Sequence, residues 1–140
     1  MAQITAAQVK ALRDRTGLPM MDCKSALAEA EGDADKAVDI LRKRGAAAAD
    51  KRADRETGEG RIACFIDPAK QAGAILEFRC ETAPVANNPE FKDMAEAFVK
   101  AAVAVPAGEA VTPESLLELP LPSDPSRKCQ DLLTDVVNKI

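Results

Sequence analysis

The hydrophobic period of the sequence changes near residue 60, and this change constrains the fold more than any other feature. In residues 1–45, apolar side chains recur at every third or fourth position, which is typical of one face of a helix. Between Arg61 and Glu81 they recur at every second position, which is typical of a strand. Because the helical and strand patterns occupy separate parts of the chain, the sequence predicts an α+β fold with two cores.

Three short helices are predicted in residues 1–45, each between a start signal and a glycine. The start signals are the capping box of Thr5 and Gln8, then Pro19, then Asp33, and the glycines are Gly17, Gly32 and Gly45. In the second helix we expect Met20 to face the core and Met21, about 100° further round, to point elsewhere. A bundle of this size is only marginally stable alone, so we expect contact with a partner to stabilise it.

Residues 46–60 read AAAADKRADRETGEG and contain no apolar side chain larger than alanine. A helix formed there would have no strong apolar face to bury. We therefore interpret this stretch as a linker, helical or not, between a domain of residues 1–45 and a second domain of residues 61–140.

The strand pattern predicts an antiparallel hairpin that is covered by a helix. The apolar face of its second strand comprises Ala74, Leu76, Phe78 and Cys80. A turn centred near Lys70 would place Cys64 opposite Leu76, and this register gives no support for a disulfide between Cys64 and Cys80. Asn88 as N-cap and Pro89 in the first turn then start the covering helix.

Two further helices are predicted near the end of the chain, started by Thr112-Pro113 and Asp124-Pro125. The second of them ends at the apolar residue Ile140 without a glycine or another C-cap. We interpret this ending either as the truncation of a longer protein or as a helix whose end a partner covers.

The composition favours a protein partner over nucleic acid or membrane. The net charge is -4, whereas binding to the phosphate backbone needs clustered lysine and arginine. The chain shows neither the apolar segment of a signal peptide nor an apolar run of roughly 18 residues, so we expect a cytoplasmic protein without a membrane span.

No constellation of residues predicts catalysis, a cofactor or a metal site. The four cysteines are widely spaced, and the chain contains no histidine to serve as a base or ligand. Phosphate-binding, dinucleotide-binding and zinc-protease motifs are all absent. We therefore predict that the protein is not an enzyme, with a thiol enzyme using Cys64 or Cys80 as an open alternative.

Two stretches are candidates for partner binding. An exposed methionine at Met20-Met21, beside the turn at Gly17, would be an adaptable contact, although both side chains could instead be partly buried. The stretch TAPV, residues 82–85, is predicted to be a stiff projecting loop, because Pro84 fixes its own φ and drives Ala83 toward extended backbone. A routine connection between strand and helix is the alternative interpretation of this loop.

Both stretches lie in segments that resemble a known family. RTGLPMMDCKSAL and EAEGD resemble the RTGAGMMDCKKAL and EANGD segments of bacterial elongation factor Ts. GEGRIACFID resembles the family's hairpin, and CETAPVANNPEF resembles its CETDFVAKNDEF segment. The similarity covers nearly the whole chain, most clearly up to about residue 104, and DLLTDVVNKI resembles the helix that leads into further core strands in the family.

The resemblance implies a fold and a function. It implies a three-helix domain of the ubiquitin-associated (UBA-like) type in residues 1–45, a linker in residues 46–60, and the first part of an α+β core in residues 61–140. It also implies a guanine nucleotide exchange factor that binds the translational GTPase elongation factor Tu. Such a factor promotes GDP release by disturbing the Mg²⁺ and phosphate site of the GTPase, without covalent chemistry of its own.

The resemblance also assigns roles to residues. The positions that grip the GTPase in the family correspond to Leu12, Arg13, Met20 and Met21, and the ends of the intruding segment correspond to Thr82 and Val85. Ala83 and Pro84 stand where the family usually carries Asp and Phe. Losing a wedging Phe forfeits about 1 to 3 kcal/mol of apolar burial. We hypothesise that the stiff backbone at these two residues supplies the wedge by its shape.

Two further functions remain open at this point. A chain with an altered wedge and without the rest of the core could dock on elongation factor Tu without promoting exchange. A peptide-binding adaptor built on the small helical domain would rest on analogy of fold alone. The oligomeric state is not predicted by the residues, although a partial core that exposes an apolar sheet edge would favour association.

Overall fold

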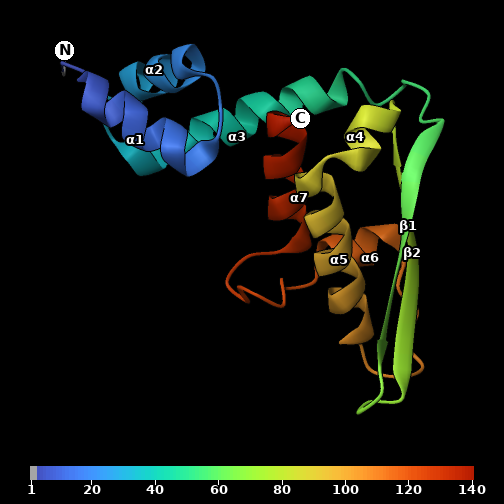
Figure 1. Cartoon of the computed structure of the whole chain (residues 1–140). Coiled ribbons are helices and arrows are strands. Elements are labelled where there is room, and N and C mark those ends of the chain that lie inside the picture. The colour runs from blue at the N-terminus through green and yellow to red at the C-terminus, as the bar shows by residue number, and fades with distance from the viewer. Residues whose placement is uncertain (1–2) are drawn as a thin grey trace. The chain divides into compact units, whose positions relative to one another are not determined.

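The computed structural model describes residues 3–140 (Figure 1). Within these residues it has seven helices and one two-stranded antiparallel sheet, which confirms the predicted α+β class. The chain divides into two compact units. One extends to Asp54 and takes in Val137–Ile140, and the other runs from Arg55 to Val136. None of the helices seen in this part of the chain is long and apolar enough to cross a membrane.

The first unit is built from three helices, as the start signals predicted. They are α1 (Ala6–Thr16), α2 (Met20–Glu29) and α3 (Ala34–Asp50). The Thr5–Gln8 capping box starts α1, and Asp33 starts α3 by accepting hydrogen bonds from the backbone N–H groups of Asp35 and Lys36. Pro19, which the sequence predicts in the first turn of the second helix, is instead the N-cap of α2. Their shared core comprises Val9, Leu12, Cys23, Ala26, Leu27, Ala30, Ala37 and Leu41.

The prediction that Gly45 ends the third helix is wrong, because α3 continues through it to Asp50. Four alanines follow Gly45, and alanine is the residue that most favours helix. Their combined propensity outweighs the cost of one glycine in a helix interior, about 1 kcal/mol. The first part of the predicted linker is therefore helical.

The hairpin consists of β1 (Glu59–Asp67) and β2 (Ala72–Cys80). Its register differs by one residue from the prediction, since Cys64 pairs with Ile75 and not with Leu76. The Asp67 side chain accepts hydrogen bonds from the backbone N–H groups of Ala69 and Lys70, which centres the turn before Lys70. Because side chains alternate between faces, the one-residue difference places Cys64 on the face opposite that of Leu76.

One face of the hairpin packs against α5 (Pro89–Val103). Asn88 starts this helix as predicted, accepting a hydrogen bond from the backbone N–H of Glu90. The rings of Phe78 on β2 and Phe98 on α5 lie with their centroids 5.7 Å apart in a tilted arrangement. The inner face of the sheet and the apolar stripe of α5 thus form the second core.

Two C-terminal helices follow, α6 (Pro113–Leu117) and α7 (Cys129–Lys139), and α7 belongs to this unit up to Val136. The capping box of Thr112 with Ser115 starts α6, as expected from the Thr-Pro pair. The prediction that Asp124-Pro125 starts the last helix is wrong. Asp124 instead closes a local turn by accepting hydrogen bonds from the backbone N–H and the hydroxyl of Ser126.

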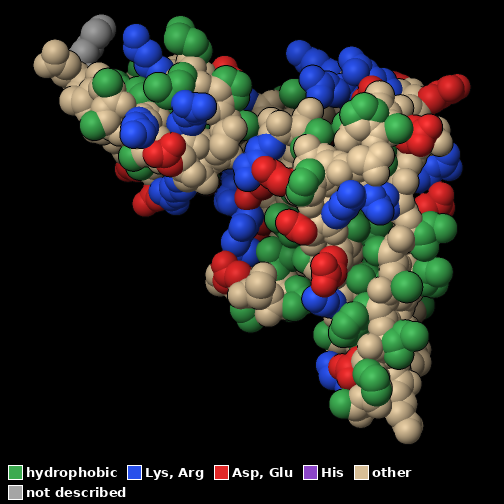
Figure 2. Space-filling view, viewed as in Figure 1, with side chains coloured by type: hydrophobic (Ala, Val, Ile, Leu, Met, Phe, Trp, Pro, Cys, Tyr) green, Lys and Arg blue, Asp and Glu red, His purple; other side chains and the backbone are tan. Residues whose placement is uncertain are grey.

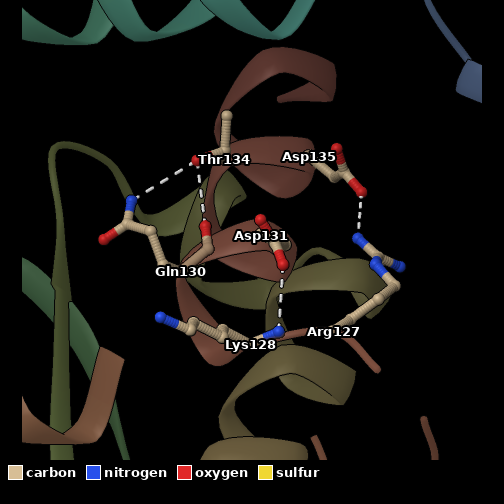
Figure 3. Close-up of polar contacts among 6 residues, drawn as sticks. All are labelled: Arg127, Lys128, Gln130, Asp131, Thr134 and Asp135. Atoms are coloured by element: carbon tan, nitrogen blue, oxygen red, sulfur yellow. Dashed lines mark hydrogen bonds and ion pairs between the residues drawn. The ribbon is translucent and has the colours of Figure 1, made fainter. Parts of the chain in front are cut away.

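The start of α7 is stabilised by side chains from its own first turns (Figure 3). Asp131 accepts a hydrogen bond of 2.9 Å from the backbone N–H of Lys128. Asp135 lies one turn further along and pairs with the guanidinium of Arg127. The two carboxylates thus contact the two residues that precede α7, while Cys129 and Val136 face the core.

Candidate partner-binding sites

Residues 83–87, predicted as part of a projecting loop, form a short helix, α4 (Ala83–Asn87). Thr82 has extended backbone at its N-cap, with φ -140° and ψ 152°, and Pro84 lies in the first turn. A proline there loses no helical hydrogen bond, because the first N–H groups of a helix have no partner within it. The expectation that Pro84 keeps Ala83 extended is therefore wrong, since Ala83 is the first helical residue.

Both ends of α4 are held by neighbouring side chains. Arg61 on β1 donates from Nη1 to the carbonyl oxygen of Ala86 at 3.2 Å and to Oδ1 of Asn87 at 3.4 Å. Asn87 in turn donates from Nδ2 to the carbonyl oxygen of Ala83 at 3.0 Å. At the start of the helix, the Cys80 thiol donates to the carbonyl oxygen of Thr82 at 3.3 Å. The segment is thus fixed to the sheet.

The predicted residues of this site differ in exposure along α4. Thr82, Ala83 and Pro84 are exposed and adjacent, whereas Val85 is half-buried and packs on the second core. Ala86 is buried at 5% exposure beneath them. The exposed part of α4 is therefore a small apolar projection on a fixed base, and it carries neither the carboxylate nor the aromatic ring that the family segment usually has.

The turn between α1 and α2 presents the other predicted residues. Gly17 has φ 71°, in the left-handed region that glycine adopts easily, and its backbone N–H donates to the carbonyl oxygen of Arg13 at 2.7 Å. The Thr16 hydroxyl donates to the carbonyl oxygen of Leu12 at 2.8 Å. Local hydrogen bonds thus fix the end of α1 beside the start of α2.

The four predicted partner-binding residues beside this turn, which we call the first group, differ in their exposure to solvent. Leu12 is 2% exposed and belongs to the core, so its contribution to any surface is to position its neighbours. Arg13 is exposed, and Met20 and Met21 are 44% and 73% exposed. The expectation that Met20 faces the core is wrong, because its side chain is 44% exposed and burial in α2 begins only at Cys23.

The two predicted groups lie in different units of the chain. Leu12, Arg13, Met20 and Met21 belong to the first unit, and residues 82–85 belong to the second. The first group lies at the end of α1 and the start of α2, and the second lies at the start of α4. Sequence reasoning missed Arg61 and Asn87, because the predicted register placed Arg61 on the face away from the core and its partner Ala86 lies 25 residues further along the chain.

The described residues offer little for catalysis or metal binding. Within residues 3–140, no group of three or more histidine, cysteine, aspartate or glutamate side chains is placed to hold a metal ion. Cys23, Cys80 and Cys129 are buried and reduced, and burial raises the pKa of the Cys129 thiol. Cys64 alone among the four is exposed, and it remains unpaired.

Comparison with curated proteins finds relatives named elongation factor Ts. Elongation factor Ts of Clostridium acetobutylicum is 44% identical over 137 residues, which cover 98% of this chain and 44% of the relative. That of Chlorobium limicola is 48% identical over 121 residues, covering 86% of this chain and 41% of the relative. That of Nautilia profundicola is 54% identical over 100 residues, covering 71% of this chain and 33% of the relative. No protein-family model matches the chain.

These relatives are elongation factors by name, which places the chain in that class of protein. Within the class, the chain belongs to the elongation factor Ts family, the family that its sequence resembles. The chain spans less than half the length of these relatives.

Proposed function

We propose that the chain acts in translation as a guanine nucleotide exchange factor for elongation factor Tu, in the cytoplasm and without covalent chemistry. The observation that carries this proposal is the 44% identity to an elongation factor Ts across 98% of the chain. The two exposed candidate surfaces, one in each unit, support it because each lies in a segment that resembles the family.

Exchange of this kind needs no catalytic residue. A protein that binds the nucleotide-free GTPase more tightly than the GDP-bound form must, by thermodynamic linkage, weaken the binding of GDP by the same factor. The exchange factor therefore acts through differential binding alone. The lack of a metal cluster or catalytic constellation in the described residues presents no obstacle to this function.

In this proposal, the first unit grips the GTPase. Arg13, Met20 and Met21 form the exposed contact, and buried Leu12 positions the end of α1 behind them. Two adjacent exposed methionines suit such a surface, because the unbranched thioether side chain adapts its shape to a partner at small cost. A surface of this kind supplies affinity without selecting one nucleotide state.

The second unit supplies the selectivity between nucleotide states. Thr82, Ala83 and Pro84 project from α4 and would reach toward the Mg²⁺ and phosphate site of elongation factor Tu. Displacing the cation removes charge that compensates the diphosphate, so GDP binds less tightly. Because α4 is short and tied at both ends, little conformational entropy is lost when it inserts.

A second candidate function is docking on elongation factor Tu without exchange. One observation favours it: Ala83 and Pro84 replace the usual Asp and Phe of the family segment. The grip of the first unit would persist in this case, and the effect on GDP would be lost.

The affinities for two forms of elongation factor Tu test the proposal. Calorimetry of this chain against nucleotide-free and GDP-bound elongation factor Tu is expected to show at least about tenfold tighter binding to the nucleotide-free form. Equal affinities would support docking without exchange. Binding to neither form would overturn both candidate functions and leave an adaptor role.

A further inference from the structure

Two methionines follow each other at the exposed start of α2, and we call Met20 and Met21 the methionine pair. Met21 is 73% exposed and Met20 is 44% exposed, whereas Met94 on α5 is 3% exposed in the second core. Figure 2 shows hydrophobic side chains lying among charged ones on the surface of α1 and α2. Peroxides oxidise the thioether sulfur of methionine, and exposure to solvent governs how readily they reach it. The described residues therefore include two accessible thioethers and one that the fold shields.

The first turn of α2 has hydrogen-bond donors for an added oxygen. Within the described part of the chain, no side chain caps this helix, whose N-cap is Pro19. The backbone N–H of Cys23 donates to the carbonyl oxygen of Pro19 at 3.1 Å. The N–H groups of Met20, Met21 and Asp22 come before it, where a helix supplies no acceptor of its own. A sulfoxide oxygen carries partial negative charge, so the positive end of the helix favours it.

Oxidation of the methionine pair leaves the core of the first unit intact. Burial in α2 begins only at Cys23, so the pair lies outside that core. Lys24 is exposed three residues beyond Met21 on the helix surface, and it offers a second donor to the same oxygen. An oxygen added to Met94 would instead enter an apolar core. Oxidation of the pair therefore changes a surface, whereas oxidation of Met94 would disrupt the fold.

We infer that the methionine pair is a reversible oxidation site for hydroperoxides, and that its oxidation weakens the contact with elongation factor Tu. The second half of this inference rests on the proposed function, which places both side chains in the grip on the GTPase. A methionine contact is favourable because the side chain is apolar and adaptable. The sulfoxide is polar, so burying it against a partner costs free energy unless the partner supplies a hydrogen-bond donor.

The reaction needs only a hydroperoxide as co-reactant. A lone pair of the methionine sulfur attacks one peroxide oxygen, so that an S–O bond forms and the O–O bond breaks. With hydrogen peroxide, the second oxygen takes the proton of the transferred hydroxyl and leaves as water. The sulfur is thereby oxidised by two electrons and the peroxide is reduced. Methionine sulfoxide reductases reverse the change at the expense of two thiols, which yields a disulfide and water.

Peptide mass spectrometry of the full chain after exposure to hydrogen peroxide tests the site itself. We expect Met21 to be oxidised faster than Met20, and both at least about tenfold faster than Met94, because a buried thioether reacts only when the fold opens. In urea, where exposure no longer differs, the three rates should converge. Far-ultraviolet circular dichroism establishes that the chain without urea stays folded. Oxidation of Met94 as fast as that of the methionine pair in the folded chain would overturn the site.

The affinity for nucleotide-free elongation factor Tu tests the consequence of oxidation. The variant Cys64→Ser serves as the background, because it lacks the exposed thiol that peroxide also oxidises. Oxidation of the methionine pair should weaken binding at least about tenfold, and methionine sulfoxide reductases should restore it. An affinity that oxidation leaves unchanged would overturn the link to binding. If the reduced chain fails to bind, the proposed function is wrong, whereas the oxidation rates still decide whether the site exists.

Leucine variants assign the effect to particular sulfur atoms. Leucine has nearly the volume of methionine but no sulfur, and each variant is compared with its own untreated form. In Met20→Leu with Met21→Leu, peroxide should change the affinity less than about twofold, because no thioether is left at the contact. Met94→Leu keeps the methionine pair and should lose affinity on oxidation as the background does. The reverse result would place the sensitive sulfur in the second core and contradict the inference.

Discussion

Arg61 on β1 donates a hydrogen bond from its guanidinium to the carbonyl oxygen of Ala86 on α4, at a distance of 3.2 Å. The last carbonyls of a helix have no partner within it and carry partial negative charge, which a guanidinium satisfies. A helix of five residues has little stability of its own, so such contacts determine whether it forms. The sheet thereby fixes the element that we propose to enter the GTPase.

Replacing Arg61 by alanine is expected to loosen α4. One hydrogen bond contributes about 0.5–1.5 kcal/mol net, so the backbone N–H groups of Ala86 and Asn88 should exchange roughly two- to twelvefold faster with solvent. The same variant should lower the acceleration of GDP release from elongation factor Tu by a similar factor. Hydrogen exchange followed by nuclear magnetic resonance measures the first effect, and a fluorescent GDP analogue measures the second.

Arg79→Ala is the matched control for this prediction. Arg79 lies on the adjacent strand and donates from Nε to the carbonyl oxygen of Thr57 at 2.9 Å, away from α4. The Arg79→Ala variant should leave the hydrogen exchange of the backbone N–H groups of Ala86 and Asn88 unaltered. Equal effects of Arg61→Ala and Arg79→Ala would mean that the sheet as a whole, and not the contact of Arg61 with α4, was disturbed.

Replacing both Ala83 and Pro84 by glycine tests whether stiffness supplies the wedge. Glycine disfavours helix by about 1 kcal/mol relative to alanine, and losing the proline restores freedom at φ. We expect the double variant to bind elongation factor Tu through its first unit but to accelerate GDP release at least about tenfold less than the wild type. Release at the wild-type rate would show that the shape of this backbone is irrelevant.

Phe98 is expected to dominate the stability of the second unit. It is 2% exposed, and its ring packs against Phe78 with the centroids 5.7 Å apart. Phe98→Ala should lower the free energy of unfolding by about 3–5 kcal/mol, through lost burial and the cavity left behind. Urea denaturation followed by circular dichroism provides the measurement. Phe65→Ala removes a half-buried ring under Lys100, so it should cost clearly less, and the reverse order would contradict this assignment of the core.

Asp33 is expected to make the first unit sensitive to acid. The backbone N–H of Lys36 and then that of Asp35 hold the pKa of this carboxyl below its usual range. The folded-state pKa is therefore the lower one, so its stabilisation is fully present above the unfolded pKa and is lost as pH falls through the folded pKa. The midpoint of thermal unfolding of the first unit should therefore fall as the pH is lowered through the folded-state pKa of Asp33. Asp33→Asn keeps a capping oxygen without a titrating group, and its midpoint should fall less over the same range.

The start signals of helices could be predicted from the sequence because they act locally. Thr5 with Gln8, Asp33, Asn88 and Thr112 each start a helix where the sequence indicated. A side-chain oxygen two or three residues before an N–H group can satisfy that group without help from the rest of the fold. The prediction that a helix ends at Gly45 was wrong, because the helix propensity of the alanines that follow it was the stronger local effect.

The hairpin shows why one small error changed the predicted surface. The turn was placed half a residue too far along the chain, so Cys64 was paired with Leu76 and not with Ile75. Since the period of a strand is two, this error assigned Cys64 to the wrong face. Register depends on the Asp67 turn and on packing against α5, which a pattern within one strand does not contain.

The form of α4 also depended on contacts from outside the segment. The residues APVAN contain a proline and too few positions to predict a helix by periodicity. Arg61, which lies more than twenty residues earlier in the sequence, supplies a contact that local rules do not include. The position of the candidate segment could be predicted from the resemblance, but its conformation could not.

The dissociation rate of a fluorescent GDP analogue from elongation factor Tu, with and without this chain in excess, tests the central claim most directly. We predict that the chain accelerates dissociation by at least about tenfold, since exchange requires coupling of that size. A dissociation rate that is unchanged while the chain is bound would contradict exchange activity and establish a docking protein.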